Sequence, residues 1–294
     1  MEIASTGYSL GPTRVRLVIR SMDLPETMKS LLQQYGISPR RLGQNFLVEP
    51  SVFELMADYA SLASNDVVLD VGGGLGFLTR FLAKRCRHVL TVEMDCRVAE
   101  ALRNQLRDHK NVEVIEGNVL EVRIPYFNKA VSVPPYYISS RLIMWLFGRH
   151  FERGALVLQK EFARRLVAAV GSQDYGWLTV LTYYHSEVGL HDRVPRQWFY
   201  PSPNVDSIIV SFSAKEESPF ELRDESKFAP LVKNLFRQRN RKVRNAALPY
   251  IKAGSFGACA DEAADFAGSL PFCDRRVREL APEDFGVLAN ALIK

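Results

Sequence analysis

Short apolar runs rich in β-branched residues alternate with helix-periodic segments along the first two thirds of the chain. Such runs are typical of buried strands, and apolar residues three and four apart are typical of helices that cover a sheet. The strands are expected at 66–71, 89–92, 112–115, 129–133 and 155–159. The helices are expected at 24–35, 52–59, 77–82, 98–106, 138–147 and 161–170. This alternation predicts an α/β fold with a parallel sheet, whose ligands bind at the carboxyl ends of the strands.

The pattern changes in the last third of the chain. Two further stretches show strand-like alternation, at 180–188 and 205–212. Beyond about Lys215 the strand patterns end, and two long helical stretches are expected at 228–248 and 261–292. Their predicted breaks are Pro249 and Pro271.

The change in pattern predicts a division of the chain into parts. We expect a loose extension over residues 1–23, an α/β domain over 24–214 and a small all-helical domain over 215–294.

A glycine-rich loop follows the first strand. Gly72, Gly74 and Gly76 occupy alternate positions, and Phe77 stands where a dinucleotide-binding loop needs its third glycine. The loop therefore matches a nicotinamide-dinucleotide fold poorly and resembles the nucleoside-binding loop of S-adenosylmethionine-dependent methyltransferases. Glu93 ends the second strand, where an acidic side chain can hold ribose hydroxyls. The alternative is an ordinary strand-to-helix turn without a ligand.

Composition narrows the class of protein. The 294 residues are 47% hydrophobic, enough for a large core, and the formal net charge of +5 suits an anionic partner. The four cysteines lack metal-ligand spacing, and no apolar run approaches membrane-spanning length. We expect a monomeric protein without a metal site or membrane contact, located in the cytoplasm. An arginine-bearing organellar presequence is the alternative.

Seven motifs together resemble one family, the ribosomal RNA small-subunit adenine dimethyltransferases. They are the glycine loop and the segments at 42–47, 159–168, 174–181, 199–207, 235–245 and 278–285. The resemblance implies a Rossmann-like class I methyltransferase sheet with a small all-helical C-terminal domain. It also implies transfer of methyl groups from S-adenosyl-L-methionine to two adjacent adenosines near the 3′ end of small-subunit rRNA. The partner would be this rRNA in the immature small ribosomal subunit.

The resemblance assigns roles to individual residues. The cofactor would be held by Gln44, Asn45, Leu47, Asp70, Gly72, Gly74, Glu93, Met94, Asn118 and Val119. Asp70 would lie near the cofactor's amino-acid end, and Asn118 stands where the family often has aspartate. The target adenine would be held by Val133, Pro134, Tyr136 and Phe199.

Val133 departs from the family's pattern. The exocyclic amine of adenine is a poor nucleophile, and the family activates it with an asparagine side chain and the next residue's carbonyl as hydrogen-bond acceptors. Val133 stands in place of that asparagine, and strand alternation points Ser132 to the opposite face. We therefore predict impaired methyl transfer. The alternatives are a non-catalytic RNA-binding factor for ribosome assembly or transcription, and a DNA adenine methyltransferase.

Five cations fall within eight residues near the start of the helical part. They are Arg237, Arg239, Arg241, Lys242 and Arg244, expected on a helix, and no acidic residue intervenes from Lys227 to Leu248. We predict that this basic run binds the phosphate backbone of RNA, because nothing within the segment offsets its charge. The alternative is a solvated charged face.

Overall fold

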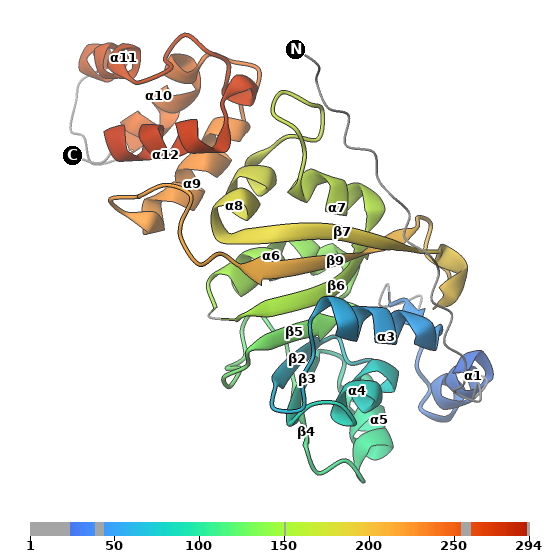
Figure 1. Ribbon diagram of the computed structural model, residues 1–294. Coiled ribbons are helices and arrows are strands. Elements are labelled where there is room, and N and C mark those ends of the chain that lie inside the picture. The colour runs from blue at the N-terminus through green and yellow to red at the C-terminus, as the bar shows by residue number, and fades with distance from the viewer. Residues whose placement is uncertain (1–23, 39–43, 150, 254–259, 293–294) are drawn as a thin grey trace, which may run out of the picture.

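A seven-stranded sheet forms the centre of the molecule in the computed structural model, which describes residues 24–38, 44–149, 151–253 and 260–292 (Figure 1). The strands lie in the order β4-β3-β2-β5-β6-β9-β7. Their bounds are β2 (Val67–Val71), β3 (His88–Glu93), β4 (Val112–Glu116), β5 (Lys129–Ser132), β6 (Arg153–Gln159), β7 (Ser186–Val194) and β9 (Ser207–Ala214). Strands β2 to β6 run parallel to one another, and β9 pairs antiparallel with both β6 and β7. The α/β fold predicted from the sequence is confirmed, with a sheet that is parallel over β2 to β6 and antiparallel at β9 and β7.

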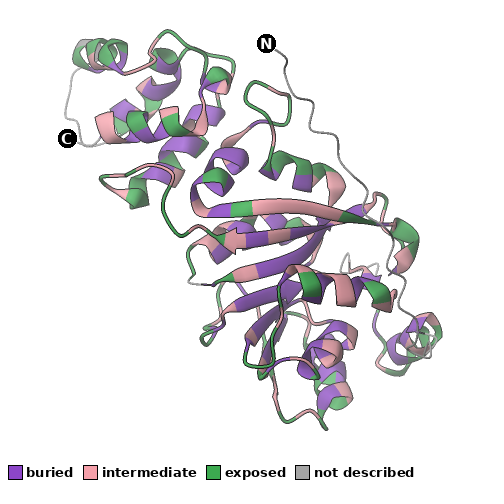
Figure 2. Ribbon diagram, in the orientation of Figure 1, coloured by how far each residue is buried: buried purple, intermediate pink, exposed green. Residues whose placement is uncertain are grey.

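Helices cover both faces of this sheet. They are α3 (Pro50–Tyr59), α4 (Phe77–Ala83), α5 (Cys96–Leu106), α6 (Ser139–Phe147), α7 (Lys160–Leu166) and α8 (Trp177–His185). Helix α1 (Leu24–Gln34) lies outside this layer and packs against Val98 and Ala101 of α5. Figure 1 shows α3 and α6 on opposite faces. Alternation along β2 explains this: Val68 packs in the cluster with α3 and α4, whereas Leu69 packs in the cluster with α6. Figure 2 shows that the strands are largely buried, whereas the outer surfaces of the helices are exposed.

The strand predicted over 180–188 is wrong in its first part. Residues Trp177–His185 form α8, and strand β7 begins at Ser186. Leu178 packs in the core of the sheet, while Val180 and Leu181 pack in the core of the C-terminal helices. Because α8 is buried from more than one side, its sequence lacks the single apolar stripe that marks a surface helix.

The helix expected over 161–170 is also too long. Helix α7 ends at Leu166, and Val167 and Val170 are exposed in the turn that follows. These two valines have no core to pack against, so no buried face stabilises another helical turn.

The C-terminal part contains α9 (Glu225–Phe236), α10 (Val243–Ala253), α11 (Ala260–Ser269) and α12 (Pro282–Ala291), besides a 3₁₀ turn η3 (Val277–Glu279). The single helix predicted over 228–248 is therefore two helices. Pro249 lies inside α10 and does not end it, which corrects the prediction. The buried face of α10, with Val243, Ala246 and Ile251, holds the helix together across the missing N–H group. The break at Pro271 is present between α11 and η3.

Helix α8 joins the two parts of the chain. Its residues Val180, Leu181 and Tyr184 share a buried cluster with Phe228 of α9 and Phe285 of α12. The core of the C-terminal helices therefore includes residues of α8, and the domain boundary at residue 215 stays a prediction. The extension over residues 1–23 lies outside the described residues.

Candidate functional site

A pocket lies where the predicted parallel sheet should bind its ligands, at the carboxyl ends of β2, β3 and β5. We call it the strand-end pocket. It is lined by Gln44, Asn45, Phe46, Gly72, Gly74, Glu93, Val133, Pro134, Pro135 and Tyr136. Residues expected at a cofactor and residues expected at a target base thus face one pocket.

The glycine loop is pressed against its neighbours on two sides. Gly72 has φ +77°, and a Cβ atom there would lie 2.9 Å from Cδ of Pro135. Gly74 has φ +55°, and a Cβ atom there would lie 2.9 Å from Cε1 of Phe46. Side chains larger than glycine would therefore meet both strain and steric contact at these positions.

The carboxylate of Glu93 is held by backbone amides. One oxygen accepts hydrogen bonds from the N–H groups of Met94 (2.9 Å) and Asp95 (3.1 Å), and the other accepts from Gly74 (3.1 Å). Burial raises the pKa of Glu93, and these three hydrogen bonds oppose that rise. The side chain is thereby fixed across the glycine loop and the pocket wall.

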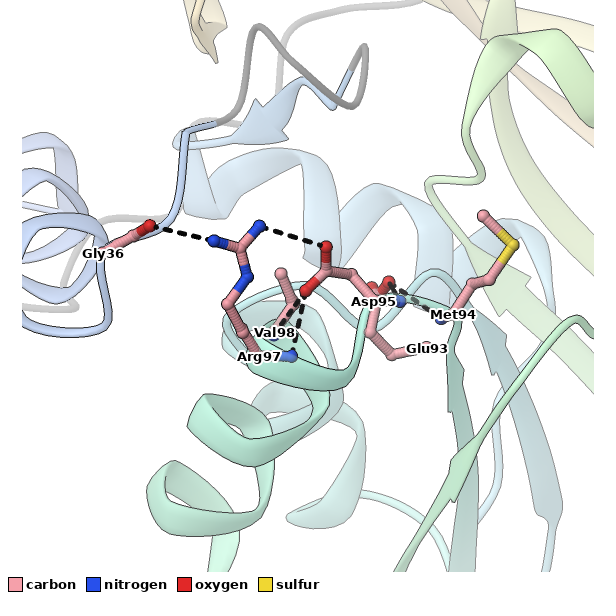
Figure 3. Close-up of polar contacts among 6 residues, drawn as sticks. All are labelled: Gly36, Glu93, Met94, Asp95, Arg97 and Val98. Atoms are coloured by element: carbon pink, nitrogen blue, oxygen red, sulfur yellow. Dashed lines mark hydrogen bonds and ion pairs between the residues drawn. The ribbon is translucent and has the colours of Figure 1, made fainter.

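A second hydrogen-bond network connects the residues after Glu93 to the turn that follows α1. Asp95 caps α5 by accepting hydrogen bonds from the N–H groups of Arg97 and Val98, and Arg97 donates to the carbonyl of Gly36 at 3.4 Å (Figure 3). The side chain of Met94 points away from Arg97 in the same view and is 56% exposed. An exposed methionine beside a nucleoside site can pack against a flat ring.

Asp70 lies beneath the glycine loop and does not line the strand-end pocket. It is buried and accepts a hydrogen bond of 2.7 Å from the hydroxyl of Thr79. Burial raises the pKa of Asp70 to about 7, and the nearby charge of Glu93 adds to the rise. The expected role of Asp70 at the amino-acid end of a cofactor stays a prediction.

Three other residues expected at the cofactor lie outside the lining of the strand-end pocket. Leu47 is buried in β1 (Phe46–Leu47), and Val119 is buried in the core. Asn118 is occupied by its own turn: its side-chain oxygen accepts from the N–H of Leu120 and its amide donates to Glu121.

Gln44 carries a polar atom without a protein partner. Its Oε1 is buried in the pocket wall and has no hydrogen bond within the described part of the chain. Buried polar atoms are nearly always satisfied, so this oxygen marks a place for a ligand donor or a water molecule.

Two aromatic residues flank the segment after β5. The hydroxyls of Tyr136 and Ser207 are 2.6 Å apart, and the ring of Phe199 meets that of Tyr136 edge-on at 6.5 Å between centroids. Phe199 is buried in the core, whereas Tyr136 lines the pocket. Ser207 was not predicted as a site residue, although the motif at 199–207 contains it.

Val133 has the orientation that strand alternation predicts. Val131 and Val133 pack in the same hydrophobic cluster, so the side chain of Ser132 points to the other face. The Ser132 hydroxyl is buried and has no hydrogen-bond partner in the described residues. It does not replace the acceptor that Val133 lacks, since Ser132 does not line the pocket.

A two-residue ladder connects the two sides of the site. Strand β1 pairs antiparallel with β8 (Phe199–Tyr200), placing Phe46 opposite Tyr200 and Leu47 opposite Phe199. The segment that carries Gln44 is thereby bound to the segment that carries Phe199. Residues this far apart in sequence gave no sign of pairing.

Four cations of the basic run lie in the connection between α9 and α10, and only Arg244 lies on a helix, in the first turn of α10. The helix predicted for the whole run is therefore wrong for the other four. Arg239 donates to the carbonyls of Ser172 and Gln173, at 2.8 and 2.9 Å. No acidic residue of the segment itself offsets the charge, but Asp274, which lies outside it in the sequence, pairs with both Lys242 and Arg244.

Two cations of this run remain available to a partner. Arg237 and Arg241 are exposed, and their side chains form no ion pair or hydrogen bond with other described residues. Within the described ranges no helix is long and apolar enough to cross a membrane. Nor do His, Cys, Asp and Glu side chains gather there in a group that could hold a metal ion.

Comparison with protein families gives a match over most of the chain. A family model described as ribosomal RNA adenine dimethylase matches residues 38–256. A probable ribosomal RNA small subunit methyltransferase A from Methanosarcina acetivorans is 36% identical over 267 residues, which cover 90% of this chain and 97% of the relative. Its counterpart from Pyrococcus abyssi is 40% identical over 256 residues, which cover 86% of this chain and 92% of the relative.

Two solved structures share the fold. A dimethyladenosine transferase from Plasmodium falciparum has a TM-score of 0.71 and 27% identity, covering 83% of this chain and 95% of that one. The 23S rRNA methyltransferase ErmE has a TM-score of 0.60 and 30% identity, covering 85% and 100%. The Rossmann-like class I methyltransferase fold with C-terminal helices is thereby confirmed.

Proposed function

This chain belongs to the ribosomal RNA adenine dimethylase family, and we propose that it methylates the exocyclic amines of two adjacent adenosines near the 3′ end of small-subunit rRNA. The methyl donor proposed is S-adenosyl-L-methionine. The observation that carries the proposal is the strand-end pocket, where the glycine loop and Glu93 face Pro134 and Tyr136. Transfer between two bound molecules needs their sites to adjoin in this way.

The residues of the pocket fit the methyl donor. Gly72 and Gly74 line the pocket without side chains, and Glu93 presents an acidic side chain suited to ribose hydroxyls. The buried Oε1 of Gln44 accepts no hydrogen bond from the described residues, and an amine of the ligand could donate one to it. When bound, S-adenosylmethionine supplies a methyl group attached to a positively charged sulfur.

The residues after β5 would hold the target adenine. The ring of Tyr136 offers a face for stacking, and its hydroxyl contact with Ser207 fixes its orientation. Burial raises the pKa of Tyr136 to about 12, so this residue stays uncharged. The carbonyl of Pro134 would accept one hydrogen bond from the amine, turning the nitrogen lone pair towards the donor.

Val133 removes the second acceptor from this arrangement. Its side chain lines the pocket but has no oxygen or nitrogen to receive the other amine hydrogen. We therefore propose that the chain binds its cofactor and RNA and transfers methyl groups slowly.

The C-terminal part would contact the rRNA outside the pocket. Arg237 and Arg241 are the cations of the basic run with exposed, unpaired side chains among the described residues. Arg239 holds their loop against residues 172–173 and so positions it. Exposed arginines on a fixed loop suit a phosphate backbone.

The test is transfer of labelled methyl groups to hypomethylated small subunits by the full chain. We expect slow incorporation at two adjacent adenosines and none with Tyr136→Ala, because that variant loses the stacking face. Incorporation at other sites, or none despite subunit binding, would contradict the proposal; the latter result would favour a non-catalytic RNA-binding role. The cytoplasmic location and monomeric state stay predictions.

A further inference from the structure

A second tyrosine follows the one that lines the pocket. Tyr137 is 58% exposed, and its ring has no hydrogen bond or aromatic contact with the described residues. Tyr136 beside it is fixed by Ser207 and Phe199. The two tyrosines therefore have different roles, and Tyr137 contributes nothing to the core that would explain an aromatic residue there.

The local backbone directs the two rings to different places. Tyr136 and Tyr137 lie in a 3₁₀ turn, η1 (Tyr136–Ile138), which leads into α6. With three residues per turn, consecutive side chains diverge by about 120°. They cannot contact the same base. Their Cα atoms are nevertheless only about 3.8 Å apart, so a base on Tyr137 would belong to a nucleotide next to the one on Tyr136.

A cation lies one turn further along. Arg141 is exposed on α6, four residues after Tyr137, and it forms no ion pair or hydrogen bond with other described residues. Residues four apart in helical structure lie on the same side. An exposed ring and an unpaired guanidinium on one side provide a stacking surface for a base and a donor pair for a phosphate.

We propose that Tyr137 and Arg141 bind the nucleotide adjacent to the target adenosine, with its base on the Tyr137 ring and its phosphate on Arg141. This inference rests on the proposed function, whose substrate is a pair of adjacent adenosines. It adds a second base site beside Tyr136. The site would hold the neighbouring nucleotide unstacked from its strand while the target base occupies the pocket.

Exposure by itself does not identify such a site, and the chain offers a matched control. Tyr126 is 71% exposed, more than Tyr137. It comes just before β5, at the amino-terminal ends of the strands, whereas the pocket lies at their carboxyl ends. Replacing Tyr126 removes an exposed ring without touching the proposed site.

The experiment measures binding of the full chain to a small-subunit rRNA fragment that contains the two adjacent adenosines. One adenosine at a time is replaced by 2-aminopurine, whose fluorescence falls when it stacks on an aromatic ring. The proteins compared are the unchanged chain and the variants Tyr137→Ala, Tyr137→Phe, Arg141→Ala and Tyr126→Ala.

With Tyr137→Ala we expect about five- to hundredfold weaker binding and loss of quenching at one of the two positions. Tyr137→Phe should keep both the affinity and the quenching of the unchanged chain, and Tyr126→Ala should change neither quantity. Arg141→Ala should lower the salt dependence of binding by about one phosphate contact. Unchanged affinity and quenching with Tyr137→Ala would overturn the second base site alone. Failure of the unchanged chain to bind the fragment would overturn the proposed function with it.

Discussion

Replacing Val133 with asparagine would return to the pocket a side chain that can accept a hydrogen bond from the target amine. The position lines the pocket beside Pro134, whose carbonyl is the other proposed acceptor. The neighbouring Ser132 faces away, so no other side chain of the strand can perform this task.

The expected gain follows from the worth of one such bond. A hydrogen bond to a group that develops charge contributes roughly 1–3 kcal/mol. If it forms in the transition state, kcat/KM rises about five- to 150-fold. Val133 also packs against a hydrophobic cluster, so burying an amide there will lower the stability of the folded protein.

The assay is single-turnover methyl transfer to hypomethylated small subunits at saturating methyl donor. Val133→Ala is the control, since it shortens the side chain without adding an acceptor. Thermal unfolding of each variant, with the donor's spent thioether present, separates activity from stability.

Two results would refute the reasoning. Equal rates for the unchanged chain and Val133→Asn, with both folded, would mean that a side-chain acceptor is dispensable here. A gain of the same size with Val133→Ala would mean that space, not hydrogen bonding, limits transfer.

Three further predictions concern other parts of the molecule. Gly74→Ala should weaken binding of S-adenosylhomocysteine at least tenfold in calorimetry, because the new Cβ meets a side chain at 2.9 Å; Gly36→Ala, at a similar positive φ with open space around it, should not. Because burial raises the folded-state pKa of Asp70 to about 7, its contribution to stability is complete below pH 4 and declines as pH rises to about 7. In urea unfolding between pH 5 and 8, Asp70→Asn should show a smaller loss of stability with pH than the unchanged chain, and an equal loss would contradict the raised pKa. Arg237→Glu with Arg241→Glu should weaken subunit binding and flatten its salt dependence by about two phosphate contacts; unchanged binding would show that the basic run does not touch RNA.

The sequence predicted the fold where the local pattern and the tertiary environment agree. Strands β2 and β3 are short β-branched runs because both of their faces are buried, and the glycine loop between them is recognisable by composition alone. Glu93 could be located from its place at the end of a strand. Its three backbone donors could not, because one of them comes from Gly74 across the loop.

The errors occurred where burial comes from distant parts of the chain. Helix α8 was mistaken for a strand because Val180 and its neighbours pack against helices that follow some fifty residues later. The pairing of Lys242 with Asp274 was missed for a similar reason, since the acidic partner lies outside the basic run. Periodicity reports only which faces are apolar, not what covers them.

Local residue patterns by themselves determined the alternating strands and helices from β2 to β6 and the glycine loop, and the resemblance to a family added the missing acceptor at Val133. Tertiary structure alone decided that Tyr136 is held by Ser207, that β1 pairs with β8, and which arginines of the basic run stay free of protein partners. The physical reason is the range of the interactions. Backbone geometry and side-chain spacing act between neighbours in the chain, whereas hydrogen bonds and ion pairs form between whatever groups the folded core brings within about 3 Å.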